Sequence, residues 1–277
     1  MVRGTDTDIL IILLGMLGKH HEEQVPVKYN RLVYDCEQGN NQRYIDITRI
    51  HAALEAEAAG FSNALIGLHA FTGNDYTASF YHKAKKTPFN LLMNKKSSEW
   101  IQAFASMGRT GPVNHEVIES FVCAMYNPAS RSEKNVNIIR RNKLFKLAGE
   151  PEKGKFPTIN KVNCSMLPPC KKTLTQKIKR AHLVARLWGH ADTAYPSRDL
   201  NPEDFGWKKL NGVYCPLWYD GNCMPQNIRG QQEEETEPEE DEHLSPDSME
   251  KAKKMKDIQE AEWSDSSSDE DDDSDPI

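Results

Sequence analysis

The sequence has no apolar run that approaches the roughly 20 residues needed to cross a bilayer, so we expect no membrane span. It also has few cysteines, six in 277 residues, and no two of them show CxxC spacing. This favours a reduced, intracellular protein over a disulfide scaffold. No histidine lies at the spacing from these cysteines that zinc sites usually show, which argues against a structural zinc. Gly-rich nucleotide loops, GxSxG elbows and HExxH motifs are missing as well.

The N-terminal region contains a feature that signal peptides share, the apolar run Ile9–Leu14 after Arg3. Asp6 and Asp8 precede this run, however, and no small-x-small cleavage site follows it. A secretory leader has a positive rather than an acidic segment before its apolar core. We therefore do not expect a signal peptide.

Charge is distributed unevenly along the chain. The whole sequence has 35 Lys and Arg against 41 Asp and Glu, a net charge of −6. Residues 229–277 hold 5 basic and 20 acidic residues, which leaves 30 basic and 21 acidic residues, a net charge of +9, in residues 1–228. A basic body suits nucleic acid or acidic partners, although charge runs are also ordinary on solvated surfaces.

Residues 229–277 have almost no core-forming side chains, so we expect a disordered acidic tail. Ser266, Ser267 and Ser268 are each followed three residues later by an acid. This pattern resembles the substrates of acidophilic kinases such as casein kinase two, and phosphorylation would add negative charge. The tail could bind basic proteins or compete with nucleic acid for the lysines of the body, or it could serve solubility alone.

Hydrophobic patterning predicts strands near the N-terminus and helices beyond it. Strands are expected at residues 9–14, buried on both faces as in a parallel sheet, and at residues 27–34. Helices are expected after the capping residues Asp46, Ser97 and Asn114, over residues 62–71 and 133–148, and after Pro168-Pro169. Residues 196–228 contain aromatics, proline and glycine and are expected to be irregular.

The first candidate site is the pair Asp6 and Asp8, immediately before the expected strand at residues 9–14. Two carboxylates beside a sheet can bind a hard divalent cation, and two such ions can activate water in phosphodiester cleavage. The pair therefore predicts a Mg²⁺ or Mn²⁺ site. The alternative is two solvated acids at a frayed terminus, because so short a motif often occurs by chance.

The second candidate site is the segment GNDY at residues 73–76, followed by YHKAKK at residues 81–86. Its carboxylate, Asp75, is a third candidate metal ligand. Lys83, Lys85 and Lys86 are candidates for contact with nucleic-acid phosphates. An exposed helix end would account for the same lysines.

Together, the two motifs resemble the C-terminal part of the flap-endonuclease family of PIN-like nucleases. In that family an Asp-x-Asp pair stands beside a central strand, as in TDTDILIILL here, and a Leu-rich helix leads to Gly-Cys-Asp-Tyr, which LIGLHAFTGNDY matches. The resemblance covers residues 1–95. It implies that Asp6, Asp8 and Asp75 bind metal, and that residues 81–92 lie where the family grips duplex phosphates.

A closer likeness is to uncharacterised, mobile-element-associated animal proteins. They show DTDVLVLLL, then LHAFTGCD, and later an LPP segment that continues to GW. The matching segments here are LPPCKKTLTQKIKRAHLVARLW and Phe205-Gly206-Trp207, so this likeness extends to about residue 220. It implies no function beyond the nuclease-like core.

The chain departs from the flap-endonuclease pattern in two respects. The family has an acidic strand and a helix with two further acids that would lie upstream of residue 1, so we expect the chain to begin in mid-domain. Three carboxylates are few for two cations. The Gly-x-Gly of the phosphate-gripping turn is also missing, since residues 82–86 read HKAKK, and without glycine the backbone approaches a phosphate less closely.

We therefore predict an α/β fold with five parts. These are a truncated PIN-like nuclease core at residues 1–95, a helical extension at 96–148, a linker or long loop at 149–169, a helix with an aromatic-rich irregular segment at 170–228, and the disordered acidic tail at 229–277. The location expected is intracellular, with the nucleus favoured over the cytoplasm.

Two hypotheses for function follow. The first is a degenerate or truncated flap-endonuclease-like protein, weak or inactive as it stands, with Mg²⁺- or Mn²⁺-dependent phosphodiester hydrolysis if the missing half is present. The second is a non-catalytic module that binds nucleic acid or proteins and is regulated by the acidic tail. In neither is a residue assigned a catalytic role beyond metal binding.

Overall fold

The computed structural model describes residues 1–26, 30–36, 42–128, 133–149, 162–195 and 200–222. Residues 1–221 form one compact unit, a mixed α/β fold of mostly helices with small sheets. The second unit, residues 222–277, lies outside the described residues apart from Asn222. The predicted acidic tail, with Ser266, Ser267 and Ser268, therefore lies outside the described part of the chain.

A three-stranded sheet begins the unit. β1 (Val2–Gly4) pairs in parallel with β2 (Val33–Cys36), which pairs antiparallel with β3 (Arg43–Asp46). Asp35 of β2 is fully buried and accepts hydrogen bonds from Arg3 Nε and Gln42 Nε2, both at 2.8 Å. Two donors make its burial tolerable and hold β1 and the chain before β3 to the same strand. The strand predicted at residues 27–34 is thus found a few residues later, and residues 27–29 lie outside the described part.

The prediction of a strand at residues 9–14 was wrong, because this stretch lies inside helix α1 (Thr7–Glu22). Asp6 is the N-cap residue, and its carboxylate accepts the N–H of Asp8 at 2.9 Å. The apolar character continues to Leu17, longer than an ordinary strand, and the last turn carries basic residues, among them Lys19, which suits the helix dipole. A short apolar run fits either a buried strand or a buried helix, and here length and capping decide.

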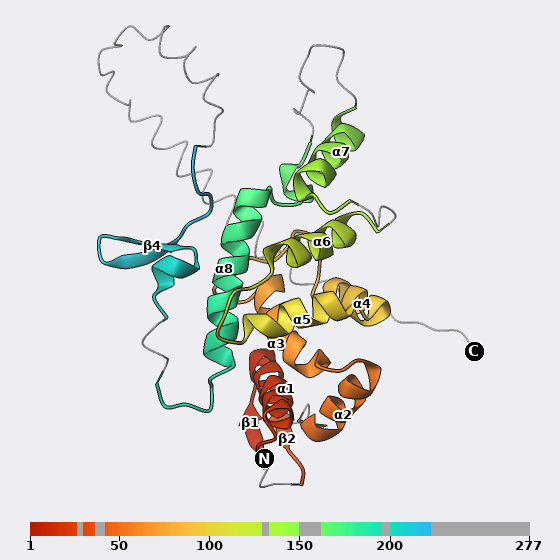
Figure 1. Cartoon of the computed structure of the whole chain (residues 1–277), viewed down its shortest axis with the longest axis vertical. Helices are drawn as coiled ribbons and strands as arrows, with labels where there is room; N and C mark the ends of the chain where they lie inside the picture. Colours follow the sequence, from red (N-terminus) through yellow and green to blue (C-terminus); the bar gives the residue numbers. More distant parts are fainter. Residues whose placement is uncertain (27–29, 37–41, 129–132, 150–161, 196–199, 223–277) are drawn as a thin grey trace, which may run out of the picture. The chain divides into compact units, whose positions relative to one another are not determined.

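Helix α3 (Phe61–Thr72) is the centre of the unit, and all its residues except Asn63 are buried. Helices α1, α5 (Ser98–Met107) and α8 (Lys171–Trp188) pack against it, as Figure 1 shows. Glycines permit the close approach: a Cβ at Gly15 would lie 2.0 Å from Ile66, and one at Gly67 would lie 2.1 Å from the carbonyl oxygen of Phe104. Segments that are distant in sequence therefore share one core.

Most of the predicted helices are confirmed, together with their caps. Asp46 accepts the N–H of Arg49 at 3.0 Å and begins α2 (Ile47–Glu57), and Ser97 and Asn114 cap α5 and α6 (His115–Tyr126). The remaining helices are α4 (Lys86–Lys95), α7 (Val136–Ala148) and α8. Of the stretch 149–169, residues 150–161 lie outside the described part, and Cys164–Met166 form a short 3-10 helix.

The prediction that residues 196–228 are irregular was wrong in part. β4 (Trp207–Leu210) and β5 (Val213–Pro216) form an antiparallel hairpin, preceded by the 3-10 helix η3 (Pro202–Phe205). Its two-residue turn, Asn211-Gly212, has both residues at positive φ, the dipeptide that such turns favour. The turn signal was present in the sequence, but the flanking aromatics hid the strand alternation.

Two further observations bear on the classes considered from composition. No helix in the described ranges combines the length and the apolarity needed to cross a bilayer. The cysteines at the described positions are free thiols, namely Cys36, Cys123, Cys164, Cys170 and Cys215.

Candidate functional site

The acidic end of α1 is the first place where sequence-predicted residues meet. Asp8, in the first turn of α1, directs its carboxylate to His69, and Asp8 Oδ1 lies 2.6 Å from His69 Nε2. His69 is a buried residue of α3, 61 positions away in sequence. The phenolic hydroxyl of Tyr34 donates to the carbonyl of Asp6 at 2.8 Å and fixes the start of the helix against β2.

His69 also contacts Lys85, which directly precedes α4. Lys85 Nζ lies 3.1 Å from His69 Nδ1 and 2.6 Å from Nε2. Burial lowers the pKa of His69, while the hydrogen bond to Asp8 acts in the opposite direction. Nε2 thus lies 2.6 Å from both the Asp8 carboxylate and the Lys85 ammonium, and one ring nitrogen cannot donate to the first and accept from the second at the same time. The ring centroid of Trp188 lies 5.8 Å from that of His69, so α8 closes the site.

Lys85 feels the charges of all three predicted carboxylates. Burial lowers the pKa of Lys85, and the charges of Asp8, Asp6 and Asp75 oppose that shift. The three acids come from two segments about 70 residues apart in sequence, and all act on one ammonium group. We call Asp6, Asp8, His69, Asp75 and Lys85 the acidic cluster.

The acidic cluster does not, as placed, form a metal centre. An Asp6 carboxylate oxygen already accepts the N–H of Asp8, and Asp8 Oδ1 is engaged with His69. In the described ranges, no three His, Cys, Asp or Glu lie close enough together to hold a metal ion. Mg²⁺ demands near-octahedral oxygen ligation, and the positive charge of Lys85, which the three acids influence, would oppose a second cation here. The residues therefore do not fit Mg²⁺ or Mn²⁺ in this arrangement.

The turn between α3 and α4 carries Asp75 and leads to the predicted lysines. Asn74 accepts the N–H of Tyr76 at 2.8 Å and donates to the carbonyl of Ala70 at 2.9 Å, so it anchors the turn to α3. Asp75 is exposed. The lysines then diverge, because Lys85 joins the acidic cluster, Lys86 is exposed at the first position of α4, and Lys83 turns toward α6.

Lys83 belongs to a second site, which the sequence reasoning largely missed. Its ammonium lies 5.3 Å from the ring centroid of Tyr126, and Lys143 of α7 lies 5.0 Å from the same centroid. Burial lowers the pKa of Lys143, and the neighbouring charges of Lys83 and Lys146 lower it further. Two like charges thus share one aromatic ring.

Tyr126 also lines a pocket of about 220 Å³. We call it the aromatic pocket, and its principal lining residues are Phe80, Tyr81, Tyr126, Lys177, Arg180 and Trp218. Lys177 and Arg180 lie one turn apart on α8 and are 7% and 2% exposed. The sequence signal was available, since Lys177 and Arg180 sit within the amphipathic stripe of α8, but helical periodicity alone does not say which cations become buried.

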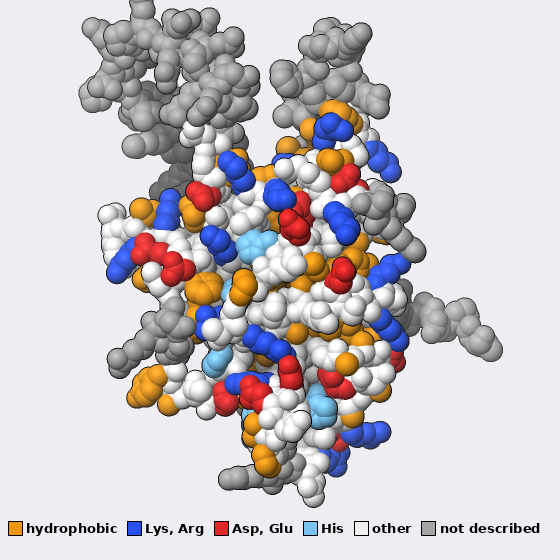
Figure 2. Space-filling model, in the orientation of Figure 1, with side chains coloured by type: hydrophobic (Ala, Val, Ile, Leu, Met, Phe, Trp, Pro, Cys, Tyr) orange, Lys and Arg blue, Asp and Glu red, His pale blue; other side chains and the backbone are white. Residues whose placement is uncertain are grey.

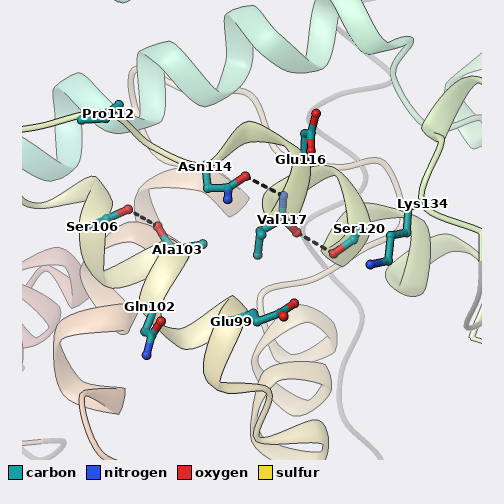
Figure 3. A pocket seen from close by; sticks show the side chains of 10 residues that line it. All are labelled: Glu99, Gln102, Ala103, Ser106, Pro112, Asn114, Glu116, Val117, Ser120 and Lys134. Atoms are coloured by element: carbon teal, nitrogen blue, oxygen red, sulfur yellow. Dashed lines mark hydrogen bonds between the residues drawn. The ribbon is translucent and has the colours of Figure 1, made fainter.

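A larger cavity, with a volume of about 540 Å³, lies between α5 and α6 (Figure 3). Its polar side chains serve the helices around it. Asn114 caps α6 through the N–H of Val117, and the hydroxyls of Ser106 and Ser120 donate to carbonyls one turn back. None of the sequence-predicted site residues lines this cavity, and its groups suggest no shared chemistry.

Positive side chains form no continuous patch on the face drawn in Figure 2, where Lys and Arg are interspersed with Asp and Glu. The net positive charge of the body is therefore not a sufficient argument for a basic interface. Any electrostatic role must come from particular clusters, such as Lys83 and Lys143.

Comparison of the chain with known protein families, with curated protein sequences and with solved structures finds no match. Any functional assignment therefore has to come from the two sites themselves.

Proposed function

We propose that this protein binds nucleic acid through its phosphates. The observation that carries the proposal is the meeting of Lys83 and Lys143 over Tyr126. Two ammonium groups held near one ring repel each other, and the charge of Lys83 adds to the effect of burial in lowering the pKa of Lys143. A phosphate between them would relieve it, and Lys–phosphate contacts also release counterions from the nucleic acid.

The proposal is tested by the salt dependence of binding. Fluorescence anisotropy with a labelled duplex, recorded at several salt concentrations, gives the slope of log K against log salt. Each phosphate contact contributes about −0.9 to that slope for B-form DNA. We expect Lys83→Gln and Lys143→Gln each to weaken binding and to make the slope shallower by about that amount.

Lys95→Gln is the matched control, because Lys95 is exposed at the end of α4. The substitution removes one positive charge, as the test variants do, at a different place. It should leave the slope unchanged. Equal losses in all three variants would show that only net charge matters, and absence of salt-sensitive binding in the unmodified protein would refute the proposal outright.

A second candidate function is metal-dependent phosphodiester hydrolysis by a PIN-like core, as the resemblance to flap endonucleases implies. What favours it is that Asp6, Asp8 and Asp75 all act on Lys85 and that Asp6 follows a parallel strand, β1. Because the carboxylates as placed do not fit a metal ion, we assign no catalytic step to them.

Calorimetric titration with Mn²⁺ and a cleavage assay on a labelled duplex test this candidate. Lys85→Met removes the ammonium on which the three acids act. The double variant, Lys85→Met with Asp8→Asn, also removes one of the acids. Mn²⁺ binding that appears in Lys85→Met and vanishes in the double variant would support the cluster as a cation site. No binding in either variant would exclude it.

A further inference from the structure

The aromatic pocket holds buried positive charge without a matching acid. Lys177 donates to the carbonyl of Ala78 and lies 4.5 Å from the ring centroid of Phe80. Arg180 Nη1 donates to the carbonyls of Gly206 and Leu217, at 3.1 and 2.7 Å. In the described part of the chain, neither cation forms an ion pair with an aspartate or glutamate.

Charges this deeply buried are normally paired. Carbonyls and ring faces satisfy part of each group, but they carry no net negative charge. A lysine has three N–H donors and an arginine five, so donors remain on both side chains after the bonds described above. The pocket therefore has the electrostatic character of a site for an anion.

Four aromatic side chains also line the pocket, beside small and aliphatic ones, and two of the rings are accessible. Tyr81 is 44% exposed and Trp218 is 54% exposed. The guanidinium of Arg180 lies 4.9 Å from the Trp218 ring centroid, which leaves the opposite ring face free of that contact. A volume of about 220 Å³ is below the usual range of sites for drug-sized ligands and matches a single ring system.

We propose that the aromatic pocket binds one unpaired nucleotide of a single-stranded nucleic acid, with the base stacked against Tyr81 or Trp218 and a phosphate near Lys177 and Arg180. This assignment rests on the proposed function and specifies the form of nucleic acid. Stacking on aromatic side chains beside cations is the ordinary way in which proteins hold single strands without reading their sequence.

The charges at the rim favour a strand over a free nucleotide. Lys83 and Lys143 contact the Tyr126 ring that also lines the pocket. Positive charge therefore continues beyond the pocket, where a free nucleotide would have no further phosphate but a strand would. Paired bases in a duplex are stacked on each other and cannot enter the pocket.

The experiment compares three probes on the full chain by anisotropy and by quenching of tryptophan fluorescence. The probes are a labelled oligothymidylate of about 12 nucleotides, within the usual site sizes for single strands, a hairpin duplex of equal length, and thymidine monophosphate. Tyr81→Ala and Trp218→Ala are the test variants. Tyr44→Ala is the matched control, because Tyr44 is 63% exposed on β3 and does not line the pocket.

We expect the test variant that removes the stacking ring, Tyr81→Ala or Trp218→Ala, to bind the oligothymidylate about fivefold to a hundredfold more weakly, which corresponds to about 1–3 kcal/mol for one stacked base. Duplex binding should be unchanged, and Tyr44→Ala should behave as the unmodified protein. Lys177→Met should also weaken single-strand binding, although removal of the buried charge should make the fold more stable. A lysine with a purely structural role would not weaken binding while its removal stabilises the fold.

Each other outcome overturns the assignment in a distinguishable way. Unchanged single-strand binding in Tyr81→Ala and Trp218→Ala, with duplex binding still dependent on Lys83 and Lys143, would refute the pocket and leave the proposed function standing. Tight binding of thymidine monophosphate without binding of the oligothymidylate would show that the ligand of the pocket is a free nucleotide and not a strand. Absence of salt-sensitive binding to every probe would refute both proposals.

Discussion

The acidic cluster and the aromatic pocket place their cations among different groups, and Lys85 is exposed whereas Lys177 and Arg180 are buried. In the acidic cluster, the charges of three carboxylates act on Lys85, which contacts His69. In the aromatic pocket, Lys177 and Arg180 are more deeply buried, yet they contact carbonyls and rings rather than acids. In the first site, carboxylates of the protein balance the positive charge. In the second, the positive charge has no acidic partner and can act on an anionic ligand. The comparison teaches that the sequence motif with the most acids is not the site best prepared for a phosphate.

The largest expected effect concerns Lys177, because its burial lowers its pKa from 10.5 to about 7. The unfolded chain then binds more protons than the folded one between about pH 7 and 10.5, so stability should rise with pH across that window. The total is on the order of a few kcal/mol, since each pKa unit corresponds to about 1.4 kcal/mol. Urea unfolding at pH 7 and pH 10 measures it, with Lys177→Met as the comparison.

Lys177→Met should be more stable than the unmodified protein at pH 7, and the difference should shrink as pH rises. Lys95→Met is the control, because Lys95 is exposed. A pH profile that is the same in the unmodified protein and in Lys177→Met would mean that Lys177 is not buried as a charge, and the contrast between the two sites would disappear.

The next effect concerns α3, which supports both sites. In Gly67→Ala the new Cβ would lie 2.1 Å from the carbonyl oxygen of Phe104, so α3 and α5 must separate. Overpacking of this kind costs about 1–3 kcal/mol or more, and thermal unfolding should show a lower Tm. Gly108→Ala is a matched control, because its Cβ would meet no atom closer than 3.7 Å. Equal Tm values would show that the close helix contact is not rigid.

A smaller effect is expected from Asp8→Asn in the acidic cluster. The change removes a charged acceptor for His69 Nε2 and an acid from the first turn of α1. Together these contribute about 1 kcal/mol to stability. The pKa of His69, already lowered by burial, should fall further, because Asp8 raises it. NMR titration of the His69 ring protons measures the shift.

Asp75→Asn is the comparison for Asp8→Asn, because Asp75 is exposed. It should leave both stability and the His69 titration close to those of the unmodified protein. Equal effects of the two variants on stability and on the His69 titration would show that the Asp8–His69 contact has no special role and that the acids act only through their overall charge.

The smallest effect should come from giving the aromatic pocket the acid it lacks. Ser165 lines the pocket and is exposed. Ser165→Asp should raise stability by about 0.5 kcal/mol, the usual size for a partly exposed ion pair, and should weaken binding of the oligothymidylate by repelling phosphate. Ser165→Asn keeps the shape without the charge and should do neither. Stronger binding in Ser165→Asp would contradict the anion assignment.

Local signals in the sequence predicted much of the helical structure. Asp46, Ser97 and Asn114 were identified as helix caps because an N-cap side chain bonds to a backbone N–H only two or three residues away. The buried character of α3 also follows from its own composition. The run at residues 9–14 was misassigned because apolar character alone does not separate a buried strand from a buried helix.

The sequence by itself also identified residues that matter individually, such as Asp6, Asp8, Asp75 and Lys83, because charged groups beside apolar elements are visible in one dimension. Only the tertiary structure decided their partners. It placed His69 between Asp8 and Lys85, separated Lys83 from Lys85, and buried Lys177 and Arg180 in one pocket with Trp218. These contacts join residues 16 to more than 60 positions apart. They depend on how α1, α3 and α8 pack, which short-range propensity cannot encode.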